Sequence, residues 1–179
     1  MYMKFWKFTG ALSLIVCMVF PLPAYGLMLG LSTQKLTRDA ALIVMGDVED
    51  VASQWTADKK FITTTAVVIV QQVIKGKLVE KKIRVMHMGG QVGDTVMRQS
   101  DVMPLNKGEK VLLFLSPEEE FSGGAAFRIE GKAQGKYSID EDHIARKQGF
   151  SYEAAHGQMD ITIPLETLTE KIRNYVDEK

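Results

Sequence analysis

Cysteine is almost absent from this chain of 179 residues, since the only one is Cys17. Cys17 lies inside an apolar run near the N-terminus, so a chain cut after Gly26 would hold none. This excludes a disulfide framework, a cysteine metal site and a cysteine nucleophile from the processed protein. A lipid-attachment site at Cys17 is disfavoured, because Val16 is bulky where such a site requires a small residue.

The chain also lacks an excess of charge of either sign, with 22 basic and 22 acidic residues. Residues 1–26 contribute two of the lysines and no acid, which leaves 20 basic against 22 acidic residues, a net charge of −2, beyond them. Nucleic-acid binding favours strongly basic surfaces, so we expect no nucleic-acid partner. The hydrophobic content of 46% and the charged content of 25% are typical of a folded globular domain.

The first 26 residues are predicted to be a signal peptide. Two lysines precede the apolar run of residues 11–20, which is too short to span a bilayer as a helix. Ala24 and Gly26 place small residues at the −3 and −1 positions of a cleavage site. We therefore expect export to the periplasm or the cell exterior, with membrane contact only through this segment if it is retained as an anchor.

Residues 27–179 are expected to form a single, mainly β domain. Apolar residues alternate with polar ones from Leu42 to Glu49, which predicts a half-buried strand, and Gly46 interrupts them as a bulge or close backbone approach. The Thr/Val-rich segment 61–74 predicts a long second strand. Later strands are predicted around residues 82–88, 111–115, 127–130 and 136–139, which makes five or six in total.

Helices are predicted at both ends of this domain. Ser32 can cap a short helix over residues 33–38. Pro164 suits the first turn of a terminal helix over residues 165–177, whose apolar stripe should pack against the sheet. The polar segment 140–158 is expected to loop over the surface. Met86 and Met88 are expected to form a small exposed apolar patch or to lie beneath the terminal helix, and the second arrangement is favoured.

The order of these features resembles a known domain. The segment 39–48, the long strand ending in Val73-Ile74-Lys75-Gly76, the run 107–115 and the turn 131–137 are similar to the netrin-like (NTR) pattern. Tissue inhibitors of metalloproteinases are its best-known members, and small exported bacterial proteins of unassigned function are closer still. The resemblance implies a five- to six-stranded antiparallel OB-like (NTR-like) barrel with a short N-terminal helix and a C-terminal amphipathic helix.

The resemblance does not extend to the inhibitory chemistry of that class. In metalloproteinase inhibitors an N-terminal cysteine freed by signal cleavage chelates the zinc of the target. The new terminus here would be Leu27, and no cysteine follows it. A protease inhibitor without a zinc-chelating cysteine therefore stays open as one alternative.

Catalytic and metal-binding patterns are weak. The three histidines, His87, His143 and His156, lack the short spacings of a zinc site, and no nucleophile elbow occurs. His87 is in phase with the apolar side of its strand, which indicates a hydrogen-bonded histidine near the barrel rim. The acidic run 118–120 is interpreted as a solvated turn. A metal-dependent or hydrolytic envelope enzyme using His87 and nearby acids remains the second alternative, and we expect no cofactor.

Two glycine- and lysine-containing segments are the predicted contact loops. The loop 89–94 lacks the spacing of a phosphate-binding motif and is interpreted as a flexible connection. Loops at one end of an OB-like barrel commonly bind partners. The predicted function is therefore an exported, non-catalytic binding or accessory domain that contacts an unknown macromolecule of the cell envelope. Its candidate contact residues are Gly89, Gly90, Gln91, Gly93, Lys132, Gln134 and Lys136.

Overall fold

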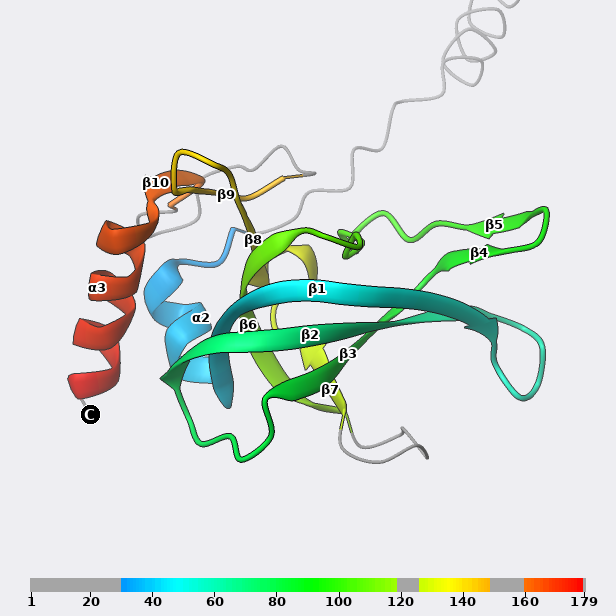
Figure 1. The fold of residues 1–179 in the computed structure, drawn as a ribbon, viewed down its shortest axis with the longest axis horizontal. Helices are drawn as coiled ribbons and strands as arrows, with labels where there is room; N and C mark the ends of the chain where they lie inside the picture. Colours follow the sequence, from blue (N-terminus) through cyan, green and yellow to red (C-terminus); the bar gives the residue numbers. More distant parts are fainter. Residues whose placement is uncertain (1–29, 119–125, 149–159, 179) are drawn as a thin grey trace, which may run out of the picture.

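A computed structural model describes residues 30–118, 126–148 and 160–178. The predicted signal peptide, Cys17 and His156 lie outside this range, as does the rest of the segment 149–159. The described chain is mainly β, with a short helix near its start and a longer helix at its C-terminal end (Figure 1). The prediction of a mainly β domain with a short helix near its start and a C-terminal helix is therefore confirmed.

The strands form one large sheet and one small hairpin. The large sheet runs β1-β2-β3-β7-β6-β8-β9-β10, and β1 also pairs with β6. Five or six strands were therefore too few for the described residues. An all-antiparallel arrangement was also wrong, because β3 and β7 are parallel. The strands are β1 (Leu42–Trp55), β2 (Ile62–Lys75), β3 (Lys82–Met88), β4 (Gly90–Val92), β5 (Thr95–Met97), β6 (Lys110–Glu118), β7 (Ala126–Ile129), β8 (Lys136–Ile139), β9 (Ile144–Arg146) and β10 (Thr162–Pro164).

The hairpin of β1 and β2 is the longest element, and β-branched residues favour its extended backbone. Its register shifts at Gly46, as the interrupted apolar alternation predicts. A Cβ at Gly46 would lie 2.3 Å from the carbonyl oxygen of Ile69, so only glycine permits this approach. This close approach explains why the long strand β1 can curve at Gly46 and still pair with β2.

Strand β6 separates two apolar cores. Val111, Leu113 and Leu115 pack into the core between β1, β2 and β3, whereas Leu112 and Phe114 face the core beneath the helices. All five side chains are buried, so the predicted central strand covered on both faces is confirmed.

The helices α2 (Thr33–Asp39) and α3 (Leu165–Asp177) cover the second core together. Leu36 of α2 and Leu168 and Ile172 of α3 are fully buried there, which confirms that the apolar stripe of the terminal helix packs against the sheet. The helices pack against each other at the end of the sheet that is opposite the long hairpin tips (Figure 1). Met86 and Met88 do not lie beneath α3, because they line a groove elsewhere.

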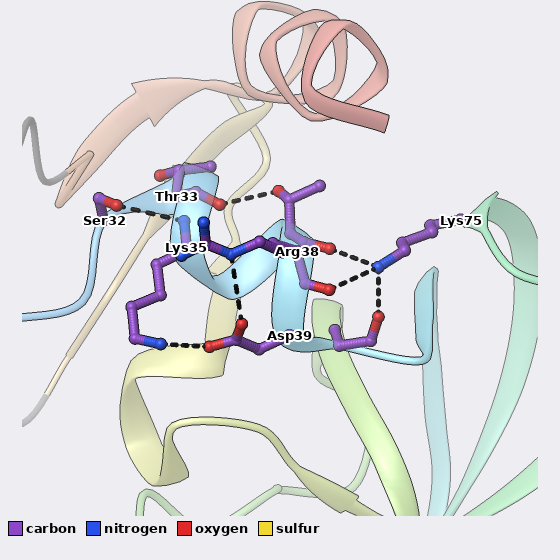
Figure 2. A network of polar contacts seen from close by, with 8 residues as sticks. Ser32, Thr33, Lys35, Arg38, Asp39 and Lys75 are labelled. Atoms are coloured by element: carbon purple, nitrogen blue, oxygen red, sulfur yellow. Dashed lines mark hydrogen bonds and ion pairs between the residues drawn. The ribbon is translucent and has the colours of Figure 1, made fainter. Parts of the chain in front are cut away.

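Both ends of α2 are capped by side chains. The Ser32 side chain accepts a hydrogen bond from the Lys35 amide, as expected for an N-cap. Figure 2 shows Lys75, at the end of β2, reaching the other end of the helix. Its Nζ donates to the carbonyl oxygens of Thr37 at 2.6 Å, Arg38 at 3.1 Å and Ala40 at 2.5 Å. The lysine thereby satisfies the C-terminal carbonyl groups of α2 and ties the helix to the sheet.

A buried polar cluster joins α2, β8 and α3. The Asp160 carboxylate accepts hydrogen bonds from the Thr33 hydroxyl at 2.8 Å and from Lys171 Nζ at 2.7 Å. The backbone carbonyl of Asp160 accepts one from the Tyr137 hydroxyl at 2.8 Å. Lys147 Nζ lies 4.8 Å from the centre of the Tyr137 ring and has no hydrogen-bond partner among the described residues. Burial lowers the pKa of Lys147 from 10.5 to about 8, although Asp160 acts in the opposite direction.

Two loop predictions need correction. The segment 89–94 is not simply a flexible connection, because β4 and β5 form a hairpin there. The segment predicted as a surface loop after residue 140 contains β9, followed by the buried Lys147. Strand β9 pairs with both β8 and β10, so this segment is part of the sheet. Its polar composition alone did not reveal this pairing. The 3-10 helix η1 (Lys132–Gly135) replaces the second predicted turn.

Candidate binding groove

A groove opens where the parallel pair of strands ends. The ladder of β3 and β7 contains only the pairs Val85–Phe127 and Met86–Arg128. Beyond it the chain of β3 continues into β4, whereas β7 leads to η1, and the two paths diverge (Figure 1). The space between them has a volume of about 890 Å³, and we call it the β3–β7 groove. Its lining residues include Thr56, Asp58, Phe61, Met86, His87, Met88, Met103, Glu118, Arg128, Glu130 and Lys132.

The walls of the β3–β7 groove carry exposed apolar side chains. Phe61 is 48% exposed and Met88 is 38% exposed, although both are large and hydrophobic. Trp55 and Val96, at 37% and 52%, are exposed on the β1–β2 and β4–β5 hairpins. Seven large hydrophobic residues are exposed in the described ranges; two of them line the groove, and Trp55 and Val96 lie near the turns of the two hairpins beside it. Such a concentration of apolar surface is typical of an interaction site.

The β4–β5 hairpin is held against the long hairpin by a close contact. Thr64 donates a hydrogen bond to the Gly89 carbonyl at 2.6 Å, and its hydroxyl lies 2.8 Å from that of Ser53. A Cβ added to Gly90 would lie 2.2 Å from the Thr64 hydroxyl, and the φ of Gly90 is 137°. Both features require glycine, so this residue positions the hairpin beside the groove.

His87 lines the groove from β3 in a neutral form. Its Nδ1 lies 3.0 Å from the Met88 carbonyl oxygen, which can only accept, so Nδ1 carries the hydrogen. The hydrogen bond of this ring was predicted and is present. Nε2 of the ring is buried and has no hydrogen-bond partner within residues 30–118, 126–148 and 160–178. Burial lowers the pKa of His87, and the charge of Lys136 acts in the same direction despite the opposing hydrogen bond to Met88.

The charges around the groove are mixed, and acids outnumber bases. Asp58, Glu118 and Glu130 line it together with Arg128 and Lys132. Lys132 forms an ion pair with Asp101 and is itself largely exposed. Arg128 forms no ion pair within the described part of the chain.

The acids of the groove differ in their local partners. Asp58 accepts hydrogen bonds from the Thr56 hydroxyl at 2.6 Å and the Lys60 amide at 3.2 Å, and these bonds lower the pKa of Asp58. Its distance to Lys60 Nζ is 3.7 Å, and that lysine is mostly exposed. Glu130 accepts a hydrogen bond from the Ser116 hydroxyl at 2.5 Å. These hydrogen bonds leave the negative charges of the Asp58 and Glu130 carboxylates in place.

The first group of predicted contact residues lies on the β4–β5 hairpin. Gln91 and Gly93 are exposed at its turn, where the Gln91 side chain donates to the Gly93 carbonyl at 3.0 Å. Gly89 is buried and Gly90 is partly buried in the contact with the long hairpin. Of these four residues, only Gln91 and Gly93 are therefore exposed enough to contact a partner directly.

The second group divides differently. Lys132 lines the groove, but Gln134 and Lys136 are buried and were wrongly assigned to a contact surface. The Gln134 side chain accepts a hydrogen bond from the Leu31 amide at 2.6 Å. Lys136 is 2% exposed, and its Nζ lies 2.8 Å from Glu109. Both residues look like turn residues in the sequence, and only the tertiary structure turns them inward.

The remaining catalytic candidates are not brought together. His143 lies on an exposed turn after β8, and its Nδ1 is 3.2 Å from the Glu141 carbonyl oxygen. Within residues 30–118, 126–148 and 160–178, no group of three or more His, Cys, Asp and Glu residues could hold a metal ion. No helix in these ranges is long and apolar enough to cross a bilayer.

Sequence inspection missed the groove itself. Phe61 was predicted to begin the second strand and Met86 to lie beneath the terminal helix, whereas their common location with Arg128 depends on the parallel pairing of β3 with β7. The exposed position of Met88 next to the inward His87 was a usable signal, because alternate residues of a strand point to opposite faces. Comparison of the chain with protein families and with curated proteins gave no match.

Proposed function

We propose that this protein is an exported, non-catalytic binding module with an OB-like barrel. Support for the barrel comes from the pairings, because β1-β2-β3-β7-β6 returns to β1 through the β1–β6 ladder. Closing a sheet in this way removes the exposed edges of these five strands. The resemblance to netrin-like domains favours the same architecture.

The observation that carries the binding function is the exposed apolar lining of the β3–β7 groove. OB-like barrels bind their ligands on the face of the second and third strands, beside the connecting loops. In this chain Met86 and Met88 of β3 and Phe61, next to β2, lie at that face. An extended polypeptide segment suits it, since thioether side chains adapt to varied apolar groups.

Binding is favoured over hydrolysis because no nucleophile contacts Nε2 of His87 among the described residues. A general base is normally held by a carboxylate or another polar group and contacts a nucleophile. The Met88 carbonyl holds the His87 ring through Nδ1, but Nε2, the basic nitrogen, contacts no polar group in the described part of the chain.

Export is part of the proposal and rests on the pattern of residues 1–26. N-terminal sequencing of the protein recovered from the cell envelope should begin at Leu27. An intact N-terminus recovered from the cytoplasm would contradict this part of the proposal.

The binding function can be tested with a displayed library of random heptapeptides selected against the full-length chain. We expect the selected peptides to lose affinity for a variant carrying Phe61→Gln and Met88→Gln. The control is Val73→Gln on β2, which is 39% exposed and lies outside the groove lining. Unchanged binding by the double variant would refute the assignment, and so would a preference for single-stranded oligonucleotides over every selected peptide.

A further inference from the structure

We propose that the β3–β7 groove recognises the main chain of its ligand, by pairing an extended polypeptide with the backbone of Met88 on β3 and of Ile129 on β7. Main-chain recognition of this kind rests on the proposed binding function and defines the ligand by its backbone. It requires that both strands present unpaired main-chain groups where they diverge, and the pairings of the sheet show that they do.

The main-chain groups of Met88 point away from β2. Lys81 and Gly89, which flank β3, each form a backbone hydrogen bond of 2.8 Å with β2. The register of β2 with β3 between them contains no shift. Alternate residues of a strand in an antiparallel pair direct their N–H and C=O groups to the same neighbour. Met86 and Met88 therefore direct theirs to the other side, where β7 lies.

Strand β7 presents an acceptor to the same gap. The amide of Glu130 donates to β6 at 2.8 Å, so the backbone of the preceding Ile129 points toward β3. The β3–β7 ladder ends at the pair Met86–Arg128, one step before the Met88 amide would donate to the Ile129 carbonyl. Within residues 30–118, 126–148 and 160–178, neither group has another hydrogen-bond partner. The divergence of the strands thus leaves one donor and one acceptor open (Figure 1).

An extended polypeptide complements both groups at once. Consecutive residues of an extended chain direct their main-chain groups to opposite sides. One ligand residue can therefore offer its carbonyl to the Met88 amide, and the next its amide to the Ile129 carbonyl. The groove volume of about 890 Å³ lies in the range of pockets that bury small ligands, so it accommodates a few residues.

The side-chain contacts add affinity with little discrimination. Met86, Met88 and Met103 have flexible side chains that fill irregular gaps, and Phe61 adds an exposed ring. Strand addition obtains affinity from the main chain, which is common to all sequences. We therefore expect the groove to accept varied apolar segments and to reject a ligand whose pairing amide is blocked.

The first test scans the ligand backbone. The probe is the tightest heptapeptide from the displayed library, fluorescently labelled, together with variants that carry a single N-methyl group at each internal position. Anisotropy with the full-length chain should show one position at which N-methylation weakens binding about tenfold, because the Ile129 carbonyl loses its donor. Methylation at the position next to it should have a smaller effect, since that amide points to the opposite side.

The second test removes the donor from the protein. Met88→Pro lacks the amide, and proline is tolerated where the N–H of a strand faces away from its partner. Met88→Ala loses the side chain but keeps the amide, so the proline variant should bind the probe about tenfold more weakly than the alanine variant. The control is Lys82→Pro, whose amide also points away from β2 but lies outside the groove lining. It should bind as the original protein does.

A further measurement covers the case in which circular dichroism shows that Met88→Pro is unfolded. Amide hydrogen exchange of the original protein, followed by NMR, should slow about tenfold at Met88 when the probe is bound. Exchange at Lys82 should not change, since this residue lies outside the groove lining. Unchanged exchange at Met88 in the saturated complex would overturn the proposed pairing.

The outcomes separate the pairing from the proposed function. A probe that tolerates N-methylation at every position, or that binds Met88→Pro and Met88→Ala equally, would overturn main-chain pairing and retain the binding module. An equal loss with Lys82→Pro would also overturn it, since any proline in β3 would then have the same effect. Absence of binding by every peptide of the library would refute the binding function itself.

Discussion

Replacing Lys147 by methionine should stabilise the protein. Lys147 is 6% exposed and its Nζ has no hydrogen-bond partner in the part of the chain that the structure describes, so its charge is poorly compensated there. Methionine keeps most of the apolar stem and removes the charge. The perturbation therefore isolates the cost of burying an ammonium group next to Tyr137 and Asp160.

The magnitude follows from the pKa of Lys147. A change of one pKa unit corresponds to about 1.4 kcal/mol, so lowering the pKa from 10.5 to about 8 costs the folded state about 3 kcal/mol at neutral pH. The variant loses the contact of the cation with the Tyr137 ring, which contributes about 1–2 kcal/mol. We expect a net gain of about 1–2 kcal/mol in the free energy of unfolding at pH 7.

The pH dependence supplies a second, independent signature. Above pH 8 the folded state releases the proton of Lys147, whereas the unfolded state retains it up to about pH 10.5. The unfolded state therefore binds more protons in this window, and the stability of the original protein rises with pH there. The variant should lack this contribution. Burial also lowers the pKa of Lys136, so part of the rise should remain.

Urea unfolding followed by far-ultraviolet circular dichroism between pH 7 and pH 10 measures both effects. The control is Lys171→Met, which removes an ion pair with Asp160 at 2.7 Å and should destabilise the protein. Loss of stability in the Lys147→Met variant at pH 7, or an undiminished rise in stability with pH, would refute the reasoning.

Three further changes test other parts of the structure. Lys75→Met should reduce the free energy of unfolding by about 2 kcal/mol, because carbonyl groups at the end of α2 lose their donor, and urea unfolding measures this. A smaller loss than that of Lys35→Met, which breaks only an exposed pair, would contradict the capping role. Gly90→Ala should loosen the β4–β5 hairpin by about 1–3 kcal/mol, because its Cβ would meet the Thr64 hydroxyl, and hydrogen exchange of the hairpin amides reports it. Protection equal to that of the original protein would count against it. His87→Leu should flatten the acid limb of the stability curve: the lowered pKa keeps His87 neutral in the fold, so the original protein loses stability as the pH falls below about 6.5. An unchanged acid limb, measured by urea unfolding between pH 7 and pH 4.5, would show that another group is responsible.

Local patterns predicted the elements of this fold well. The apolar run Val111–Leu115 was interpreted correctly as a strand buried on both faces, and Gly46 as a close approach. Ser32 and the stripe containing Leu168 located the two helices. These signals are readable because periodicity, capping and close backbone contacts depend on residues near one another in the chain or on one strand face.

The candidate site was much less predictable. Gln134 and Lys136 belong to a segment with the composition of an exposed turn, yet they are buried against Leu31 and Glu109. Met86 was wrongly predicted to lie beneath the terminal helix, because its strand does not show which other segment it contacts. Such contacts join positions far apart in the sequence, and no local pattern records which segments meet.

The sequence by itself determined a mainly β domain with a helix near each end, because alternation and helical periodicity specify which face of each element avoids water. Tertiary structure alone decided that β3 and β7 run parallel for two residue pairs and then diverge. That divergence creates the groove and gathers Phe61, Met88, Glu130 and Arg128 from different elements. The tertiary structure also buries the ammonium group of Lys147 beside Tyr137, and the energetic cost of that burial depends on the groups around it.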